Sequence, residues 1–299
     1  MIRVPSLNGK NVVVMGLGKS GTATARALAE SGAKVTAWDD NESARTAAAQ
    51  AGVAIAGPAL AGLDLLVWSP GIPHTHPVEK AHPLAAQARA AGIPIVCDVE
   101  LLARAKPANP MLAVTGTNGK STTTTLLAHV LAHTGRRVAA GGNLGTAALD
   151  MADLGPEGRY VLELSSYQLE LVQSLRLDAA VLLNITPDHL GRHGGMQGYV
   201  AAKRRLFDCV KPDGTAVVGV DDDYCVAIAT ALESQGRKVV RISAEQTLEN
   251  GVSAADGVLR VDGKPVADLR PITRLPGRHN WQNACAVFAL ARADGLAPG

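Results

Sequence analysis

Two glycine-rich turns constrain the fold of this chain most, because each lies between a strand-like segment and a helix-like segment. The first turn follows the β-branched run 11–15, and the second follows the apolar run that begins at Met111. Further strand-like segments at 33–38, 63–68, 160–164 and 179–184 alternate with alanine-rich, helix-like segments. Strands that alternate with helices predict parallel, doubly wound sheets. We therefore expect an α/β protein with two such units in series, joined by a proline-containing connector at 105–110.

Length and composition exclude several classes of protein. A chain of 299 residues is long enough for two domains, each with its own core. A formal net charge of +2 and 3% aromatic residues give no basis for binding nucleic acid or an anionic membrane. We find no apolar run long enough to span a bilayer and no signal peptide, and the four cysteines are scattered. These features predict a cytoplasmic protein with buried, reduced thiols.

The first turn has the spacing Gly16-x-Gly18-x-x-Gly21. Its glycines allow the backbone to approach a phosphate, and the free N–H groups of the following helix attract an anion. Asp39, at the end of the next strand, is placed to accept hydrogen bonds from a ribose or a base. Taken alone, this turn favours an NAD-dependent oxidoreductase. A non-catalytic nucleotide-binding module, or a turn that only packs helix against strand, remains an alternative.

The second turn, Gly116-Thr-Asn-Gly119-Lys120-Ser121, departs from the general phosphate-binding loop because its two glycines are three positions apart instead of five. Its remaining parts are those of an ATP site. Backbone N–H groups can surround the phosphates, Lys120 can neutralise their charge, and Ser121 can ligate Mg²⁺. Glu163 ends one apolar strand, and Asp188-His189 follows the next. Open α/β sheets bind ligands at this edge, so these residues predict an ATP–Mg²⁺ site.

Other polar residues fit neither turn, and the sequence predicts surface positions for them. Lys203 lies in a Lys-Arg-Arg run, which is typical of a solvated helix face. The same expectation applies to the histidines of a proline-rich loop, to an i, i+4 histidine pair and to an acidic turn: His74, His76, His82, His129, His133 and Asp221–Asp223.

Five segments together resemble the Mur ligase family over nearly the whole chain: 116–122, 162–170, 184–189, 199–203 and 277–283. The resemblance implies a Rossmann-like domain at 1–100 that binds a UDP-linked substrate, followed by a P-loop ATPase-like domain at 101–299 that binds ATP. It implies an ATP-dependent ligase of peptidoglycan precursor synthesis. Its substrates would be UDP-N-acetylmuramoyl-L-alanine and D-glutamate, joined by an amide bond through an acyl phosphate. We expect a cytoplasmic monomer that binds neither nucleic acid nor a membrane.

The resemblance also implies roles for individual residues. The substrate would contact Gly18, Lys19, Ser20, Asp39, Asp40, Ser69, Pro70, Gly71, Asn143 and Ser165. ATP would contact Gly116, Thr117, Asn118, Gly119, Lys120, Ser121, Thr122, Asn280 and Asn283. Catalysis would depend on Lys120, Glu163, His189 and Lys203. Of two Mg²⁺ ions, Ser121 and Glu163 would hold the first and His189 the second, with Lys203 carbamylated to support the metal site.

The chain departs from the family pattern in two places. Gly191 stands where members often have an acid, so no role for that acid is expected here. Members also continue into a third domain that receives D-glutamate, and its signature is absent. We therefore expect two domains of a longer enzyme, inactive without the third.

Overall fold

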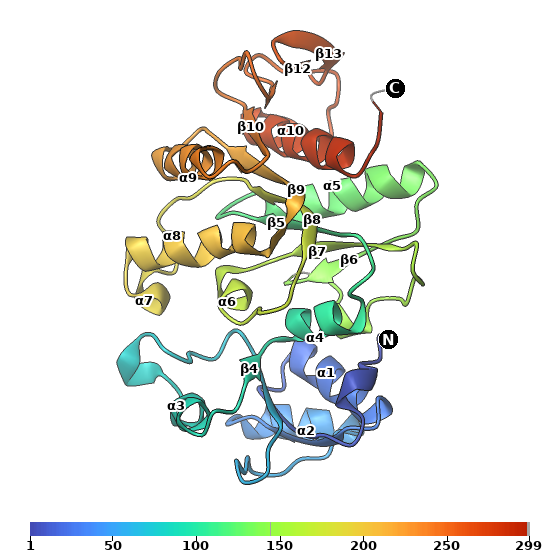
Figure 1. The fold of residues 1–299 in the computed structure, drawn as a ribbon, viewed down its shortest axis with the longest axis vertical. Coiled ribbons are helices and arrows are strands. Elements are labelled where there is room, and N and C mark those ends of the chain that lie inside the picture. The colour runs from blue at the N-terminus through green and yellow to red at the C-terminus, as the bar shows by residue number, and fades with distance from the viewer. Residues whose placement is uncertain (144, 298–299) are drawn as a thin grey trace.

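The computed structural model describes residues 1–143 and 145–297, which form two sheets with helices packed around them (Figure 1). The first sheet has four parallel strands in the order β2-β1-β3-β4. The second has nine strands in the order β13-β12-β11-β10-β9-β8-β5-β7-β6, parallel except where β12 pairs with β11 and β13. The predicted α/β fold class, with two parallel-sheet units in series, is therefore confirmed.

The first sheet contains β1 (Asn11–Met15), β2 (Lys34–Trp38), β3 (Leu65–Trp68) and β4 (Ile95–Val96). Around it lie α1 (Lys19–Glu30), α2 (Glu42–Gln50), α3 (Pro83–Ala90) and the short 3-10 turns η1 (Pro5–Leu7) and η2 (Val78–Lys80), and α4 (Asp98–Ala105) follows it. Helix α1 has Gly18 as its N-cap, so Lys19 and Ser20 occupy its first turn. A Cβ on Gly21 would lie 1.8 Å from the carbonyl oxygen of Gly16, so this glycine allows the close contact of helix with turn.

The second sheet contains β5 (Met111–Thr115), β6 (Val138–Gly142), β7 (Arg159–Glu163), β8 (Leu177–Leu182), β9 (Val210–Gly219), β10 (Val239–Ser243), β11 (Val252–Ser253), β12 (Val258–Val261) and β13 (Lys264–Asp268). Its helices are α5 (Lys120–His133), α6 (Ser166–Leu169), α7 (Leu190–His193), α8 (Met196–Arg204), α9 (Asp223–Ser234) and α10 (Arg278–Ala293), with the 3-10 turns η3 (Ala148–Asp150) and η4 (Arg205–Cys209). No helix of the described chain is both long and apolar enough to cross a bilayer.

Strand β5 is buried along its whole length and serves two cores. Leu112 and Val114 belong to the cluster beneath α5 and α10, whereas Met111 and Ala113 belong to the cluster on the opposite face. Successive side chains of a strand point to opposite faces, and a sheet covered on both faces needs apolar residues at every position. This explains why the segment reads as a continuous apolar run.

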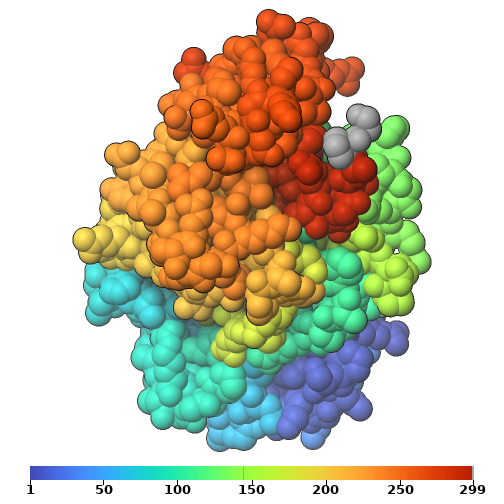
Figure 2. Space-filling view, turned by 45° about the horizontal axis from the view of Figure 1, so that its top comes forward, coloured from blue at the N-terminus to red at the C-terminus, as the bar shows by residue number. Residues whose placement is uncertain are grey.

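An apolar cluster connects the two units, and the expectation that each unit has its own core stays a prediction. One apolar cluster extends from Val13 and Leu66 of the first unit, through Leu149 and Leu169, to one face of the second sheet. The first unit occupies one end of the molecule and the β12–β13 hairpin the other (Figure 2). The predicted division at residue 100 falls inside α4 and stays a prediction.

Candidate functional site

A cavity of about 440 Å³ lies between the two units, and seven of the predicted substrate-binding residues line it. The first unit contributes Lys19 and Ser20 from α1 and the segment Ser69–Gly71 after β3. The second contributes Asn143, after β6, and Ser165, the N-cap of α6. The structure therefore brings together residues up to 146 positions apart (165 − 19) from both units.

Three predicted substrate residues lie outside this lining, namely Gly18, Asp39 and Asp40. The carboxylate of Asp39 supports the first glycine turn, because its Oδ2 accepts a hydrogen bond from the Leu17 amide at 2.7 Å. Asp40 contacts the Trp38 indole Nε1 at 3.1 Å and the His82 Nε2 at 3.3 Å. Contact of Asp39 with a base, and of Asp40 with the substrate, stays a prediction.

In the second glycine turn, two lysines donate to one carbonyl oxygen. Lys120 Nζ lies 3.0 Å from Gly116 O and 2.7 Å from Thr117 O, and Lys203 Nζ lies 2.7 Å from Gly116 O. Burial lowers the pKa of Lys120 below its usual value, although the charges of Glu163 and Asp188 act in the opposite direction. The turn therefore gathers positive charge where a phosphate would need it.

The expectation that Lys203 is solvated was wrong, because the residue is 2% exposed. It lies on the inner face of α8, and its ammonium also lies 4.8 Å from the centre of the Tyr199 ring. Burial, together with the nearby positive charge of Lys120, lowers the pKa of Lys203 to about 7. A run of cationic residues in a sequence does not show which of them lies on the buried face of the helix.

Glu163 is buried at the end of β7, and its two carboxylate oxygens differ. Oε1 accepts a hydrogen bond of 2.8 Å from Asn143 Nδ2, whereas Oε2 is buried without a hydrogen-bond partner among the described residues. A buried anionic oxygen that lacks a partner is costly, and a bound cation would satisfy it. Glu163 and the Ser121 hydroxyl on α5 thus have the donor chemistry that Mg²⁺ prefers.

His189 has a left-handed backbone, with φ 50°, and caps α7. Its ring lies 3.3 Å from the carboxylate of Asp188, and both side chains are largely exposed. Within residues 1–143 and 145–297, no group of three or more His, Cys, Asp or Glu is arranged as a metal site. The metal roles of these residues stay predictions.

Asn283, on α10, is buried behind the second glycine turn. Its Oδ1 accepts a hydrogen bond of 3.1 Å from Thr123, and its Nδ2 donates to Asn280 at 3.2 Å. A Cβ on Gly119, whose φ is 83°, would lie 2.5 Å from Asn283 Oδ1. In this structure Asn283 therefore shapes the turn from behind.

The acidic turn after β9 was expected to be solvated, but two of its aspartates form hydrogen bonds to other elements. Asp221 accepts hydrogen bonds from the Ala244 amide at 2.9 Å and from Gln282 Nε2 at 2.8 Å. Asp222 caps α9 and accepts a hydrogen bond of 3.0 Å from the Ile185 amide. These aspartates therefore join β8, β9 and β10 at the sheet edge that carries the predicted ATP site.

Sequence reasoning also misplaced His74, which is 6% exposed. Its Nε2 lies 2.9 Å from the carboxylate of Glu170, a residue of the second unit. Tyr167 and Gln168, which line the cavity, were assigned no role either. Tyr167, Gln168 and Glu170 all belong to the segment Leu162–Glu170, which is one of the five segments that carry the family resemblance. That segment was therefore the sequence signal that could have identified them.

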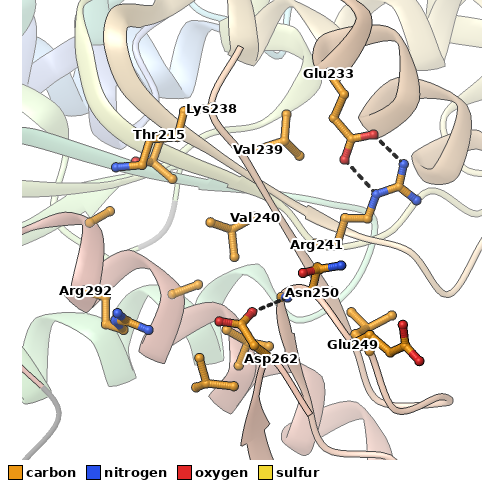
Figure 3. A pocket seen from close by; sticks show the side chains of 16 residues that line it. Thr215, Glu233, Lys238, Val239, Val240, Arg241, Glu249, Asn250, Asp262 and Arg292 are labelled. Carbon is orange, nitrogen blue, oxygen red and sulfur yellow. Dashed lines mark hydrogen bonds and ion pairs between the residues drawn. The ribbon is translucent and has the colours of Figure 1, made fainter. Parts of the chain in front are cut away.

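A larger cavity, of about 680 Å³, lies along β10 between the end of α10 and the loop before β11 (Figure 3). Its polar lining includes an ion pair between Arg241 and Glu233, and Asp262, which accepts a hydrogen bond from the Gly251 amide. None of the predicted site residues lines it. The larger cavity is therefore separate from the predicted site.

The fold and the clustered residues define a nucleotide-binding α/β protein of the P-loop type. Family models give the particular family: the Mur ligase middle domain matches residues 114–291, and the Mur ligase MurD-like, N-terminal domain matches residues 10–97. The chain belongs to the Mur ligase family.

Curated relatives agree with this assignment. A UDP-N-acetylmuramoylalanine–D-glutamate ligase of Paramagnetospirillum magneticum is 67% identical over 301 residues, covering 100% of this chain and 65% of the relative. The protein of the same name from Rhodospirillum rubrum is 52% identical, covering 96% and 63%. The chain thus spans about two thirds of the length of these relatives.

Solved structures support the fold. A UDP-N-acetylmuramate:L-alanyl-γ-D-glutamyl-meso-diaminopimelate ligase of Neisseria meningitides matches with a TM-score of 0.65 at 22% identity, covering 96% of this chain and 94% of the other. A UDP-N-acetylmuramate-alanine ligase of Thermotoga maritima matches with a TM-score of 0.57 at 20% identity, covering 96% and 65%.

Proposed function

We propose that this chain supplies the substrate and ATP domains of a ligase that adds D-glutamate to UDP-N-acetylmuramoyl-L-alanine. One observation carries the proposal: a single cavity joins Lys19 and Ser20 of the first glycine turn to Asn143, which is hydrogen-bonded to Glu163 beside the second. An elongated anionic substrate can therefore bind its nucleotide end at one turn and present its acyl end at the other.

The reaction begins when the alanyl carboxylate of the substrate attacks the γ-phosphate of ATP, giving an acyl phosphate and ADP. The amine of D-glutamate then displaces phosphate, forms the amide bond and loses a proton. Because two anions must meet in the first step, catalysis depends on positioning and on positive charge. Lys120 provides this charge once its ammonium leaves the carbonyls of Gly116 and Thr117 for the phosphates.

Mg²⁺, when bound, would supply further positive charge to the phosphates. We assign Ser121 and Glu163 to a first ion and His189 to a second. The buried Oε2 of Glu163, which has no hydrogen-bond partner within residues 1–143 and 145–297, supports the first assignment. Asn143 would hold the other carboxylate oxygen in place through its hydrogen bond of 2.8 Å.

We further propose that Lys203 is carbamylated. Its lowered pKa, about 7, leaves a large share of the amine neutral at physiological pH. The neutral amine adds to the carbon of CO₂, forms an N–C bond and releases one proton. The product is a buried anion beside Lys120, which replaces the repulsion between the two lysines by attraction.

Two other functions explain fewer features of the site. An NAD-dependent oxidoreductase accounts for the first glycine turn and leaves the convergence of Lys120 and Lys203 on Gly116 unexplained. A non-catalytic nucleotide-binding module leaves the buried oxygen of Glu163 unexplained.

Thermal unfolding of the chain with separate ligands tests the proposal. We expect UDP-N-acetylmuramoyl-L-alanine to raise the melting temperature and NAD to leave it unchanged. A ligand that binds only the folded state adds about 2.7 kcal/mol at one hundred times its dissociation constant. Stabilisation by NAD, with none by the UDP compound, would contradict the proposal.

A further inference from the structure

The carboxylate of Glu170 joins three segments of the molecule. It lies 2.9 Å from His74 Nε2, 2.9 Å from His193 Nδ1 and 3.5 Å from Arg192 Nη1. His74 belongs to the first unit, in the loop that follows Ser69–Gly71 of the cavity wall, whereas Arg192 and His193 belong to α7. Glu170 itself directly follows α6, which brings Tyr167 and Gln168 to the cavity.

The partners of His74 decide its tautomer. Its Nδ1 contacts Arg89 Nη2, and a guanidinium nitrogen can only donate, so Nδ1 accepts and Nε2 carries the proton. Nε2 therefore donates to Glu170. Burial acts to raise the pKa of Glu170, but the hydrogen bonds from His193 and His74 outweigh it and lower this pKa to about 2. The carboxylate is consequently ionised and accepts from both histidines.

On the other side, His193 Nε2 lies 2.9 Å from the hydroxyl of Ser166, the first residue of α6. The order Ser166, His193, Glu170 is that of a serine–histidine–acid triad. However, Ser166 is 3% exposed, and neither it nor His193 lines the cavity. The hydroxyl has no access to a substrate, so the chain of hydrogen bonds holds α6 in place instead of supplying a nucleophile.

We propose that Glu170 is a positioning residue for the acyl end of the substrate, an inference that rests on the proposed function. Helix α6 has only four residues, too few to hold its own geometry. A capping box between Ser165 and Gln168 fixes its first turn, and Glu170 fixes its end to both the first unit and α7. Glu170 thereby sets Ser165, Tyr167 and Gln168 relative to Ser69–Gly71 across the cavity.

This role predicts that loss of Glu170 affects binding of the two ends of the substrate differently. Lys19 and Ser20, which we assign to the nucleotide end, lie on α1 and do not depend on α6. Loss of the Glu170 links should therefore weaken binding of UDP-N-acetylmuramoyl-L-alanine and leave binding of UDP unchanged. A variant that is merely less stable would not produce this split.

Isothermal titration of the chain with both ligands provides the test. For Glu170→Gln we expect affinity for UDP-N-acetylmuramoyl-L-alanine to fall about tenfold, equal to about 1.4 kcal/mol, with UDP affinity unchanged. Glu233→Gln is the matched control, because Glu233 forms an ion pair with Arg241 far from α6 and outside the proposed site. It should leave both affinities at the wild-type values.

Glu170→Gln removes the negative charge beside Arg192, which is buried, and this destabilises the fold. If this variant does not fold, a second pair of variants tests the same role. His74→Ala removes the donor to Glu170, whereas His74→Gln retains an N–H near the position of Nε2. We expect the alanine variant to lose affinity for the muramoyl ligand selectively and the glutamine variant to recover it.

The outcomes are distinguishable. Wild-type chain that binds neither UDP compound contradicts the proposed function and, with it, the role of Glu170. Wild-type binding together with folded Glu170→Gln or His74→Ala variants of unchanged affinity overturns the role of Glu170 alone. Parallel loss of UDP affinity also overturns it, because the effect would then not be confined to the acyl end.

Discussion

Both glycine turns lead from a strand into a helix that begins with a lysine, and they differ in where that lysine points. Lys19, in the first turn of α1, extends away from its own turn to the carbonyl oxygen of Gly145 in the other unit. Lys120, at the same place on α5, turns back onto Gly116 and Thr117 of its own turn. One turn thus directs its cation across the cavity, and the other concentrates charge within itself.

The surroundings extend this difference. The second turn receives a buried lysine from α8 and lies near a buried glutamate from β7, whereas the first is supported by Asp39 from the next strand. A glycine turn therefore provides a place for phosphate, and the side chains that other elements bring to it decide whether chemistry follows. This is why a fingerprint alone does not separate the proposed substrate site from the proposed catalytic site.

The largest effect is expected for Lys120→Ala, assayed in an enzyme of the length of the curated relatives. Loss of this cation should lower the rate of acyl phosphate formation by about 10²–10³, as removal of one well-placed electrostatic contact typically does. Binding of UDP-N-acetylmuramoyl-L-alanine should stay near normal. Single-turnover ADP release and equilibrium titration measure the two quantities.

Lys19→Ala is the complementary variant for that comparison. It should weaken binding of the UDP substrate and leave ATP binding intact, because Lys19 lines the cavity between the units. If both lysine variants lost the same function, the assignment of substrate binding to the first turn and of ATP chemistry to the second would be wrong.

A smaller effect is expected for the glycines of the first turn. In Gly21→Ala the new Cβ would lie 1.8 Å from the backbone oxygen of Gly16, so the unfolding free energy should fall by about 1–3 kcal/mol. Gly18→Ala is the control, because a Cβ there meets no atom within 4 Å. Its unfolding free energy should change by less than about 0.5 kcal/mol. Equal denaturation midpoints for the two variants would show that helix and turn are not in close contact.

A further prediction concerns the pH dependence of Lys203 carbamylation. With a pKa of about 7, the amine is about half neutral at pH 7 and almost fully neutral at pH 9. At constant dissolved ¹³CO₂, the carbamate signal in ¹³C NMR should therefore rise with pH over this range, because more of the amine is neutral and because each carbamate formed also releases a proton. A signal that persists in Lys203→Met would come from another amine and refute the assignment.

The same pKa has a consequence for stability. Folding lowers this pKa from 10.5 to about 7, so the unfolded chain binds the proton more tightly. The buried charge therefore destabilises the fold below pH 7, and this cost declines as pH rises toward 10.5. Relative to Lys203→Met, the wild-type chain should gain unfolding free energy across that interval, as measured by urea denaturation at each pH.

Much of the fold was predictable because the relevant signals are local. The strand around Met111–Thr115, the helix from Lys120 to His133 and the hairpin turn at Asp262-Gly263 follow from apolar runs and glycine positions, and the structure contains each of them. Strand β6 was missed because alanine and glycine, which do not favour strands, make up most of it. Two very short elements were missed as well, the four-residue helix α6 and the two-residue strand β11. Elements of this length carry too few residues for a periodic pattern to be recognised.

The sequence by itself determined the alternation of strands and helices, the two glycine turns and the motifs that mark the family. These depend on local backbone preference and on residue spacing, which a linear sequence records directly. Only the tertiary structure decided that Lys203 and His74 are buried, that one Glu163 oxygen has no hydrogen-bond partner among the described residues and that an apolar cluster connects the two units. Burial depends on which elements pack against a side chain, and those elements lie far away along the chain, so their effect on a charge appears only once the fold has formed.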